Sequence, residues 1–443
     1  MTTPILDFVR RYAKNSPARF HMPGHKGESA LGFEAFDLTE IEGADDLYDA
    51  DGIIAKSEEN ATALFGTAHT FYSTEGATHA IKAMLTLATS GVKKPRVLAA
   101  RNAHKAFLYG CGLLDVDVTW LYDGDTTHLC RCTVTPEMLK KALDGAENAY
   151  TAVYVTSPDY LGNVQDIEGL ATVCHAHGIP LLVDNAHGAY LAFCSPSRHP
   201  IALGADLCAD SAHKTLPVLT GGAYLHIAPR AAHLVSEARR ALSLFGSSSP
   251  SYLTLQSLDL CNETLANGYA KKLEDTAKRV SFLRNTLQNA GYVVTGDEPL
   301  KLTVSGTTRG YTGHALATTL REHHAEVEFA DEELIVLMCT PFNTAEDFAR
   351  VERALTALPA REAIEITRPV TALIAPRACS AREALLGKCE RVRTKEAVGR
   401  ICAFPTVSCP PAVPITASGE SITKEAVALF AAYGIKEIDV LVQ

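Results

Sequence analysis

The sequence lacks the features of a membrane-spanning, secreted or disordered protein. In its 443 residues no apolar run approaches the roughly 18–20 residues that a membrane span needs. The first residues, Met1 to Ile5, have no basic stretch followed by an apolar core, so we expect no signal peptide. Hydrophobic residues make up 47% and charged residues 21%, which excludes disordered and fibrous classes. We therefore expect a cytoplasmic globular protein with no membrane partner.

An excess of basic residues and the common nucleotide-binding motifs are also missing. Lys plus Arg number 41 against 51 Asp plus Glu, so the formal net charge is −10. An acidic protein repels phosphate backbones, which argues against a nucleic-acid partner. The chain has neither a Walker GxxxxGK motif nor a GxGxxG motif followed by an acidic ribose binder. Nucleotide-binding interpretations are weak for that reason.

The 12 cysteines form no pattern typical of a metal site. The close pair Cys130 and Cys132 has neither CxxC spacing nor a second half-site for zinc. His21 and His25 are four residues apart, but the Pro-Gly dipeptide between them forbids the helix that an HExxH-like zinc site needs. We predict structural thiols, a shaped loop around the two histidines, and no bound metal.

From residue 50 to 230, short apolar β-rich runs alternate with amphipathic helical patterns. This alternation predicts βαβ units, hence an α/β fold with a mostly parallel sheet covered by helices. The predicted strands are Arg96–Ala100, Val116–Leu121, Thr151–Thr156, Ile179–Asp184, Asp206–Asp210 and Ala223–Ile227, and the helical patterns include Gly76–Thr89, Thr135–Leu143 and Asp166–His177. Ligands of such sheets bind beyond the carboxyl ends of the strands, so polar residues directly after a strand are the candidates for chemistry.

Past about residue 230 the pattern changes. Long helical patterns cover Ala231–Leu244 and Ser251–Ala290. A strand–helix–strand–strand–helix order follows and predicts a small α+β domain. Its elements are Lys301–Ser305, Gly313–His323, Glu326–Ala330, Leu334–Thr340 and Ala345–Leu358. We predict four parts: an N-terminal arm (1–30), a large domain (31–265), a small domain (266–360) and a C-terminal domain (361–443).

Two charged residues follow neighbouring predicted strands. Asp184 ends an apolar run, where it could cap a helix or hydrogen-bond a buried cation such as the ring nitrogen of pyridoxal phosphate (PLP). Lys214 follows the next strand, among small and hydroxyl residues; it is either a solvated charge or a desolvated amine able to form a Schiff base with an aldehyde. Ser211 and His213 beside it are natural donors to phosphate oxygens. The order Asp then Lys is that of the aspartate-aminotransferase-like PLP fold.

A phosphate also needs a cradle of donors, and the segment Tyr72–Thr78 runs directly into a helical pattern. Backbone N–H groups at a helix N-terminus form an anion site, with Gly76 allowing close approach and Thr78 supplying a hydroxyl. A plain helix start is the alternative. His104 follows the strand Arg96–Ala100 and could stack on a cofactor ring, or it could be a satisfied surface histidine.

With these residues in place, the sequence resembles the Orn/Lys/Arg decarboxylases of the aspartate-aminotransferase fold, especially the compact bacterial arginine, lysine and ornithine decarboxylases. The matching segments are Thr3–Leu6, Arg19–Gly27, Phe36–Glu40, Asp45–Tyr48, Arg101–Lys105, Asp184–Gly188, Ser211–Pro217, Ser249–Tyr252, Gly310–Gly313, Glu328–Asp331 and Pro410–Glu420. The resemblance implies PLP-dependent fold type I: a large domain with a mixed, mostly parallel sheet, a small α+β domain and a C-terminal α/β segment.

The resemblance also implies residue roles. Lys214 would form the Schiff base with PLP, Asp184 would pair with the pyridine nitrogen, and His104 would stack on the ring. His187 would pack beside Asp184 on the substrate side, and His213 would join the catalytic set. The residues that would hold the phosphate are Gly76, Ala77, Thr78, Ser211, His213 and, from a second subunit, Ser249. The residues that would pair with a cationic substrate tail are Glu420 and either Asp45 or Asp46.

These roles imply α-decarboxylation of a basic amino acid, arginine first and then lysine or ornithine. The implied assembly is a homodimer or higher homo-oligomer with its active site at the subunit interface. A PLP-dependent aminotransferase, lyase or aldolase is the alternative, with Arg368 as a carboxylate clamp; a non-catalytic PLP-fold regulatory protein is another. This chain differs from the family pattern at six positions. It has Glu75 where the family has Asn, Ala106 where it has Ser, Asn185 where it has Glu, Tyr190 where it has His, Gly221 where it has Gln, and Ser418 where it has Pro.

Overall fold

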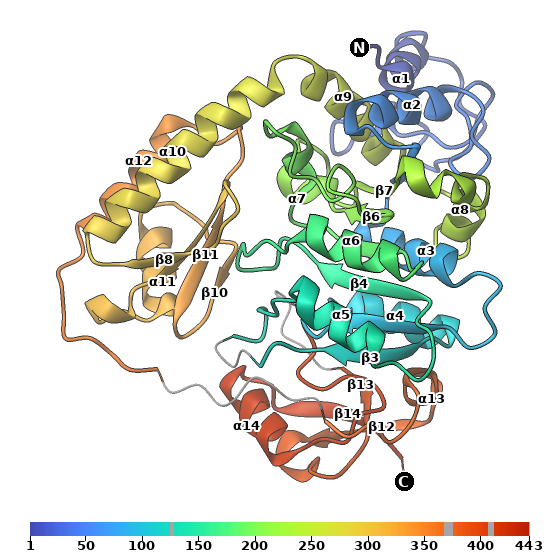
Figure 1. Ribbon diagram of the computed structural model, residues 1–443. Coiled ribbons are helices and arrows are strands. Elements are labelled where there is room, and N and C mark those ends of the chain that lie inside the picture. Colours follow the sequence, from blue (N-terminus) through green and yellow to red (C-terminus); the bar gives the residue numbers. More distant parts are fainter. Residues whose placement is uncertain (125–127, 367–374, 406–411, 443) are drawn as a thin grey trace. The chain divides into compact units, whose positions relative to one another are not determined.

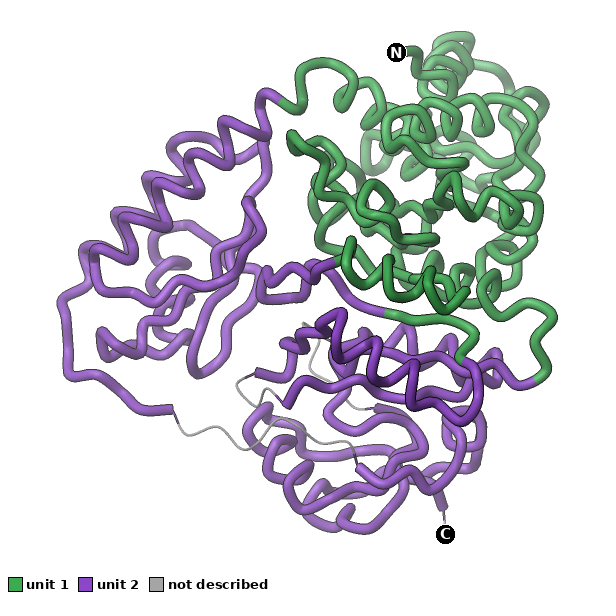
Figure 2. The backbone as a smooth tube through the Cα atoms, in the orientation of Figure 1, with its two compact units in different colours: residues 1–93, 150–154, 167–270 green, residues 94–149, 155–166, 271–443 purple. Residues whose placement is uncertain are grey.

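The computed structural model describes residues 1–124, 128–366, 375–405 and 412–442, and it divides into two compact units (Figure 2). Unit 1 consists of residues 1–93, 150–154 and 167–270, and unit 2 of residues 94–149, 155–166 and 271–443. Arg368, the alternative carboxylate clamp, lies outside the described residues. So does Pro410, the first residue of the last matching segment.

Unit 1 contains a mixed sheet whose strands follow the order β1-β7-β6-β5-β4 (Figure 1), although the last two residues of β4 belong to unit 2. The strands are β1 (His69–Ser73), β4 (Ala152–Thr156), β5 (Leu181–Asp184), β6 (Leu207–Asp210) and β7 (Ala223–Ile227). Strands β5 and β6 run parallel, with Asp184 opposite Ala209, whereas β7 is antiparallel to both of its neighbours. Because β5 and β6 are parallel and in register, Asp184 and Asp210 end at the same edge of the sheet.

Helices cover this sheet and place their ends near its edges. They are α1 (Pro4–Lys14), η1 (Glu34–Phe36), α2 (Ile53–Phe65), α3 (Gly76–Thr89), α6 (Ile167–Ala176), η2 (Ala189–Phe193), α7 (Ala212–Thr215), η3 (Pro229–Leu234), α8 (Val235–Ser243) and α9 (Tyr252–Ala266). Helix α3 packs on β6 and β7 and buries Ile81, Met84 and Leu85. This burial fixes the direction of α3 and the position of its N-terminus.

The helical pattern predicted over residues 251–290 is two helices and not one. Helix α9 ends at Ala266, and α10 (Tyr269–Asn289) begins after Gly268. Gly268 has a φ of +78°, a left-handed conformation that ends a helix and that glycine adopts without steric cost.

Unit 2 contains strands β2 (Arg96–Ala100) and β3 (Asp117–Leu121), which pair in parallel, with α4 (Lys105–Leu114) and α5 (Pro136–Asp144). A four-stranded antiparallel sheet, β10-β11-β9-β8, accompanies α11 and α12 and corresponds to the predicted small α+β fold. Its elements are β8 (Val293–Thr295), β9 (Lys301–Ser305), η4 (Thr307–Arg309), α11 (Gly313–Glu322), β10 (Phe329–Ala330), β11 (Leu334–Met338) and α12 (Ala345–Thr356). The strand predicted from Glu326 is shorter, because only Phe329 and Ala330 pair with β11.

The C-terminal part of unit 2 is a three-stranded sheet of order β12-β14-β13 with two helices. Its elements are α13 (Ala381–Leu386), β12 (Cys389–Arg393), η5 (Thr394–Glu396), β13 (Cys402–Phe404), α14 (Lys424–Ala432) and β14 (Glu437–Leu441). Phe430, Ile438 and Val440 lie at the centre of its core. The predicted α/β class with a mixed, mostly parallel sheet is confirmed, together with smaller antiparallel sheets that helices accompany. The predicted domain boundaries stay a prediction.

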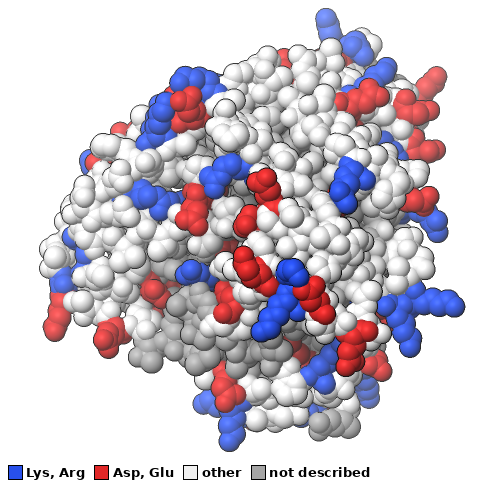
Figure 3. Space-filling model, viewed as in Figure 1, with Lys and Arg blue, Asp and Glu red and all other residues white. Residues whose placement is uncertain are grey.

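The distribution of surface charges and the character of the helices agree with the mixed charge of the sequence and with its lack of long apolar runs. On the face shown in Figure 3, acidic and basic side chains are interspersed. Among the described residues, no helix combines the length and the apolar character that crossing a membrane requires.

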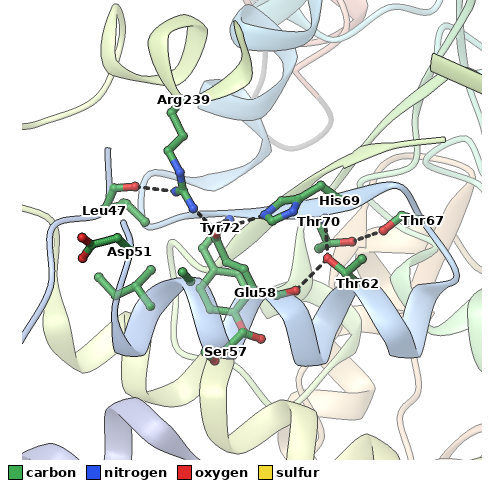
Figure 4. A network of polar contacts seen from close by, with 12 residues as sticks. Leu47, Asp51, Ser57, Glu58, Thr62, Thr67, His69, Thr70, Tyr72 and Arg239 are labelled. Carbon is green, nitrogen blue, oxygen red and sulfur yellow. Dashed lines mark hydrogen bonds and ion pairs between the residues drawn. The ribbon is translucent and has the colours of Figure 1, made fainter. Parts of the chain in front are cut away.

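A buried ion pair joins helix α2, strand β1 and helix α8 in unit 1 (Figure 4). Glu58 of α2 is fully buried, and its Oε2 contacts Arg239 Nη2 at 2.7 Å and His69 Nε2 at 3.3 Å. Its Oε1 accepts a hydrogen bond from the Tyr72 N–H at 2.9 Å. Arg239 also donates to the Leu47 carbonyl oxygen at 2.9 Å. The carboxylate therefore holds three elements together around one buried charge.

We predict that Arg239→Ala lowers the free energy of unfolding by about 3 kcal/mol, because it leaves Glu58 buried without its cationic partner. Urea denaturation measures this change. The control is the adjacent Arg240→Ala: Arg240 is exposed and pairs with exposed Glu237, so its loss should cost about 1 kcal/mol or less. Equal losses in the two variants would contradict the prediction.

Candidate active site

Asp184 and Lys214 lie close together at one edge of the sheet in unit 1. Asp184 ends β5 and is 2% exposed, and its carboxylate accepts hydrogen bonds from Tyr154 Oη at 3.0 Å and from the Ala186 N–H at 3.1 Å. Burial raises the pKa of Asp184, and the nearby Lys214 ammonium opposes that rise. Lys214 lies on α7, the short helix that follows β6. A buried carboxylate beside an amine is a site that can hold a cation.

Two histidines accompany this pair. His187 Nε2 lies 3.2 Å from Lys214 Nζ. His213 donates both its backbone N–H and its Nδ1–H to the Gly222 carbonyl oxygen, at 3.1 and 3.0 Å. This bond places the ring proton of neutral His213 on Nδ1, so Nε2 is left as an acceptor. Burial lowers the pKa of His213, which favours the neutral ring.

The predicted anion cradle lies at the N-terminus of α3, and its binding of a phosphate stays a prediction. Gly76, Ala77 and Thr78 occupy its first turn, and Gly76 has a φ of +74°. The Gly76 N–H donates to the Gly221 carbonyl oxygen at 2.7 Å. A Cβ atom on Gly221 would lie 2.5 Å from the Thr74 carbonyl oxygen, and its φ is +98°. The family pattern has Gln at this position, and the presence of Gly221 here has a steric reason: only glycine lets the backbone come this close to the Thr74 carbonyl group.

Residues 221–222 connect the cradle to the turn that carries Lys214. The carbonyl group of Gly221 fixes the first turn of α3, and that of Gly222 fixes His213. Ser211, buried just before α7, lies in the same turn. Through these bonds the start of α3 and the turn that carries Lys214 are linked.

Ser249 lies on an exposed loop before α9, where its N–H donates to Ser247 Oγ. The Ser247 N–H donates to Glu75 Oε1, so the departure from Asn to Glu75 binds this loop to the start of α3. The expectation that Ser249 reaches a second subunit stays a prediction, and its exposure is compatible with it.

His104 belongs to unit 2, where it caps helix α4. Its Nδ1 accepts a hydrogen bond from the Ala106 N–H at 3.1 Å. Capping fixes the ring at the position directly after β2. Its stacking on a cofactor ring stays a prediction.

The candidate carboxylates for a cationic substrate tail differ in their availability. Asp45 Oδ2 accepts hydrogen bonds from the N–H groups of Gly52 and Ile54 at 2.9 and 2.8 Å, so Asp45 serves the start of α2. Asp46 is exposed, and its Oδ1 accepts from the Tyr48 N–H. Both line an open acidic cavity of about 460 Å³ in unit 1. Asp46 is the better placed of the two to meet a cation from solution.

Glu420, in unit 2, is buried and already has several partners. It contacts Arg101 Nη2 at 3.5 Å and accepts hydrogen bonds from Trp120 Nε1 at 3.1 Å and from the Ala417 N–H at 2.7 Å. It lines a cavity of about 270 Å³ with apolar walls. A substrate cation at Glu420 would compete with Arg101 for the carboxylate. Asp46 is therefore the better candidate for pairing with a cationic substrate tail.

Two site residues were missed by sequence reasoning. Tyr154, on β4, donates to Asp184, and Asp210, at the end of β6, binds Asn185. The signal for Tyr154 was a hydroxyl-bearing residue inside an apolar strand. Asp210 was visible as the last residue of a predicted strand, but only the parallel register shows that it ends beside Asp184.

Comparisons with known proteins agree with this geometry. Residues 3–304 match the family "Orn/Lys/Arg decarboxylase, major domain", and residues 362–433 match its C-terminal domain. An arginine decarboxylase of Bacillus subtilis (strain 168) is 31% identical over 458 residues, covering 96% of this chain and 92% of that protein. The uncharacterized protein YaaO of the same organism is also 31% identical, covering 96% and 93%.

A likeness to solved structures shows the fold. The crystal structure of the Francisella novicida lysine decarboxylase LdcF superimposes with a TM-score of 0.79 at 16% identity, covering 99% of this chain and 81% of that one. The fold is that of the fold-type-I PLP enzymes. Within that class, the chain belongs to the Orn/Lys/Arg decarboxylase family, whose members are PLP-dependent carbon–carbon lyases that act on basic amino acids.

We predict that Gly221→Ala weakens the affinity for PLP by about tenfold or more, since its Cβ would displace the Thr74 carbonyl and with it the start of α3. Fluorescence titration of the apoprotein with PLP measures this. Gly66→Ala is the control: Gly66 also has a positive φ, +66°, but a Cβ there meets nothing within 4 Å. The prediction is wrong if the two variants bind PLP equally well.

Proposed function

We propose that this protein is a PLP-dependent α-decarboxylase of a basic amino acid, with arginine as the first candidate substrate and lysine or ornithine next. The observation that carries the proposal is the buried Asp184 beside Lys214 at the carboxyl edge of parallel strands. The relatives named arginine decarboxylase support arginine, at 31% and 30% identity. Proposed with it are a cytoplasmic location and a homodimer or higher homo-oligomer, which the family likeness supports.

The donor set fits PLP. An aldehyde carbon needs an amine, and Lys214 is held next to His187. A pyridinium nitrogen needs a buried carboxylate, and Asp184 is buried with a raised pKa. A phosphate needs backbone N–H groups and hydroxyls, which the first turn of α3 and Ser211 supply. These groups lie on two linked segments of unit 1, and contact of His104 with the ring face stays a proposal from the family likeness.

Bound PLP supplies an electron sink for the bond electrons that remain on Cα when the carboxyl group leaves as CO2. Asp184 would keep the ring nitrogen protonated, because a buried carboxylate stabilises an adjacent cation. Tyr154 and the Ala186 N–H would hold this carboxylate in position. Lys214, or His213 once its Nε2 has taken up a proton, would return a proton to Cα, which completes the exchange of a carboxyl group for hydrogen and gives the amine. Asp46 or Glu420 would select a cationic side chain.

Lys214→Ala is expected to abolish activity and the absorbance band near about 420 nm that PLP shows when joined to a lysine. The control Lys271→Ala removes an exposed lysine whose partners are Glu274 and Asp275 on α10, and it should retain both properties. Spectra of the purified proteins with added PLP decide the matter. A wild-type protein that shows no such band with PLP would contradict the proposed function.

Amine product analysis with arginine, lysine and ornithine tests the substrate. We expect CO2 and the corresponding amine from arginine, with a kcat/KM at least about tenfold higher than for the other two, because a guanidinium pairs with carboxylates through two parallel hydrogen bonds. Asp46→Asn should raise KM more than it lowers kcat. A keto acid product in place of CO2 would instead support the aminotransferase alternative.

A further inference from the structure

A second carboxylate, Asp210, is fully buried at the edge of the sheet where Asp184 lies. Its Oδ1 accepts hydrogen bonds from Asn185 Nδ2 at 2.7 Å and from Cys208 Sγ at 3.4 Å. Its Oδ2 accepts from His199 Nε2 at 3.0 Å and from His226 Nε2 at 3.1 Å. All four donors are fully or almost fully buried.

Two histidine rings face Asp210 with their Nε2 atoms. The Ile201 N–H donates to His199 Nδ1 at 3.3 Å, so the proton of that ring is on Nε2, which faces Asp210. His226 Nδ1 contacts the Thr70 hydroxyl at 2.9 Å; Thr70, labelled in Figure 4, also contacts Thr67. Burial lowers the pKa of His226, and the Asp210 carboxylate opposes that fall. Asp210 is thus held by hydrogen bonds from two histidine rings, an amide and a thiol.

Asp210 itself stays ionised. Burial alone would raise its pKa, but the bonds and charges of His199 and His226 more than offset this and lower the pKa. The ligand atoms of His199, Cys208 and Asp210 lie within 4.8 Å of one another, a spacing that a metal ion could use. The proton on His199 Nε2 occupies the direction that a metal would need, so hydrogen bonding accounts for the cluster.

Two routes connect Asp210 to Asp184. The first is mechanical: Asn185 follows Asp184 directly, its N–H donates to the Ala209 carbonyl oxygen and its side chain donates to Asp210. The turn from Asp184 to His187 is therefore fastened to β6 at both ends of Asn185. The second is electrostatic, since after burial the charge of Asp210 is among the influences that raise the pKa of Asp184. Two buried carboxylates near each other favour a cation between or beside them.

We propose that Asp210 is a positioning residue for the cofactor's ring nitrogen: through Asn185 it fixes the turn that aims Asp184, and its buried charge adds to the attraction of Asp184 for a protonated ring. The hydrogen bond to Asp210 also explains why this chain has Asn185 where the family pattern has Glu. A glutamate there would place a third carboxylate against Asp210, whereas an amide supplies the donor that Asp210 needs. This inference rests on the proposed function, because it concerns the PLP that Lys214 and Asp184 are proposed to hold.

The test is Asp210→Asn, read as the pH midpoint at which the band near about 420 nm of the PLP-loaded protein is lost. Removing one buried negative charge should lower that midpoint by about one pH unit, because nearby cations lose its stabilisation. The titratable groups facing Asp210 are His199, His226, Cys208, Tyr224 and Asp184. All five remain in the variant.

The matched control is Asp206→Asn, which removes a similar Asp–His pair just before the start of the same strand. Asp206 contacts His175 Nε2 at 2.9 Å and the exposed Arg230 Nε at 3.4 Å, and it accepts a hydrogen bond from the Leu181 N–H at the far end of β5 from Asp184. A purely structural role predicts that both variants lose thermal stability while keeping the wild-type midpoint, and that outcome would overturn the proposal. So would about one equivalent of tightly bound zinc that wild type retains and Asp210→Asn loses, since the cluster would then be a metal site.

A second variant covers the case in which Asp210→Asn does not fold. Asn185→Ala keeps the charge of Asp210 and removes the bond to the turn, so we expect the affinity for PLP to fall by about tenfold. Wild-type affinity in Asn185→Ala would overturn the mechanical route. If the wild-type protein shows no PLP band at all, the proposed function fails; if it shows the band and Asp210→Asn shares its midpoint, only this inference fails.

Discussion

Burial of the Asp184 carboxylate is the constraint on which the site depends. A carboxylate removed from water is costly unless hydrogen bonds and a nearby positive charge compensate for it. The sheet meets this need by ending β5 at Asp184, with Tyr154 on one neighbouring strand and the Lys214 turn after the other. The first turn of α3 is fastened to that same turn through residues 221–222. The groups that would bind a cationic ring, an aldehyde and a phosphate are thereby set around a single charge.

Much of the large domain could be predicted because buried strands of α/β sheets are continuous apolar runs. Strands β2 and β7 and helix α3 have the predicted bounds. Strand β1 was missed, since Thr70 and Ser73 break its apolar pattern; both are buried polar residues with side-chain partners, His226 and His79. The order of apolar and polar residues in a single sequence shows that these two positions are polar. It cannot show that each hydroxyl will form a hydrogen bond with a residue of another helix or strand.

The candidate site was predictable to the extent that it follows from strand order. An Asp after one strand and a Lys after the next are expected at the same edge if the strands are parallel neighbours, and β5 and β6 do pair in parallel, with Lys214 on the helix after β6. The roles of Asp184 and Lys214 toward a cofactor stay predictions. Tyr154 and Asp210 depend on contacts across strands, and Gly221 depends on a backbone angle, so no local pattern revealed their roles. The roles of His104, Ser249, Asp45, Asp46 and Glu420 stay predictions.

The buried Arg101 bears on how the C-terminal segment can vary. Its guanidinium donates to the carbonyl oxygens of Pro414 and Ile415 and faces Glu420, while the Trp120 ring lies under it at 5.0 Å. Among the described residues, these partners of the Arg101 guanidinium come from residues 412–420 or from β3. Exchange of this segment between relatives would succeed only where the donor retains an acceptor set for that arginine. Modularity of the C-terminal domain is therefore limited by one guanidinium as well as by the apolar core of the domain.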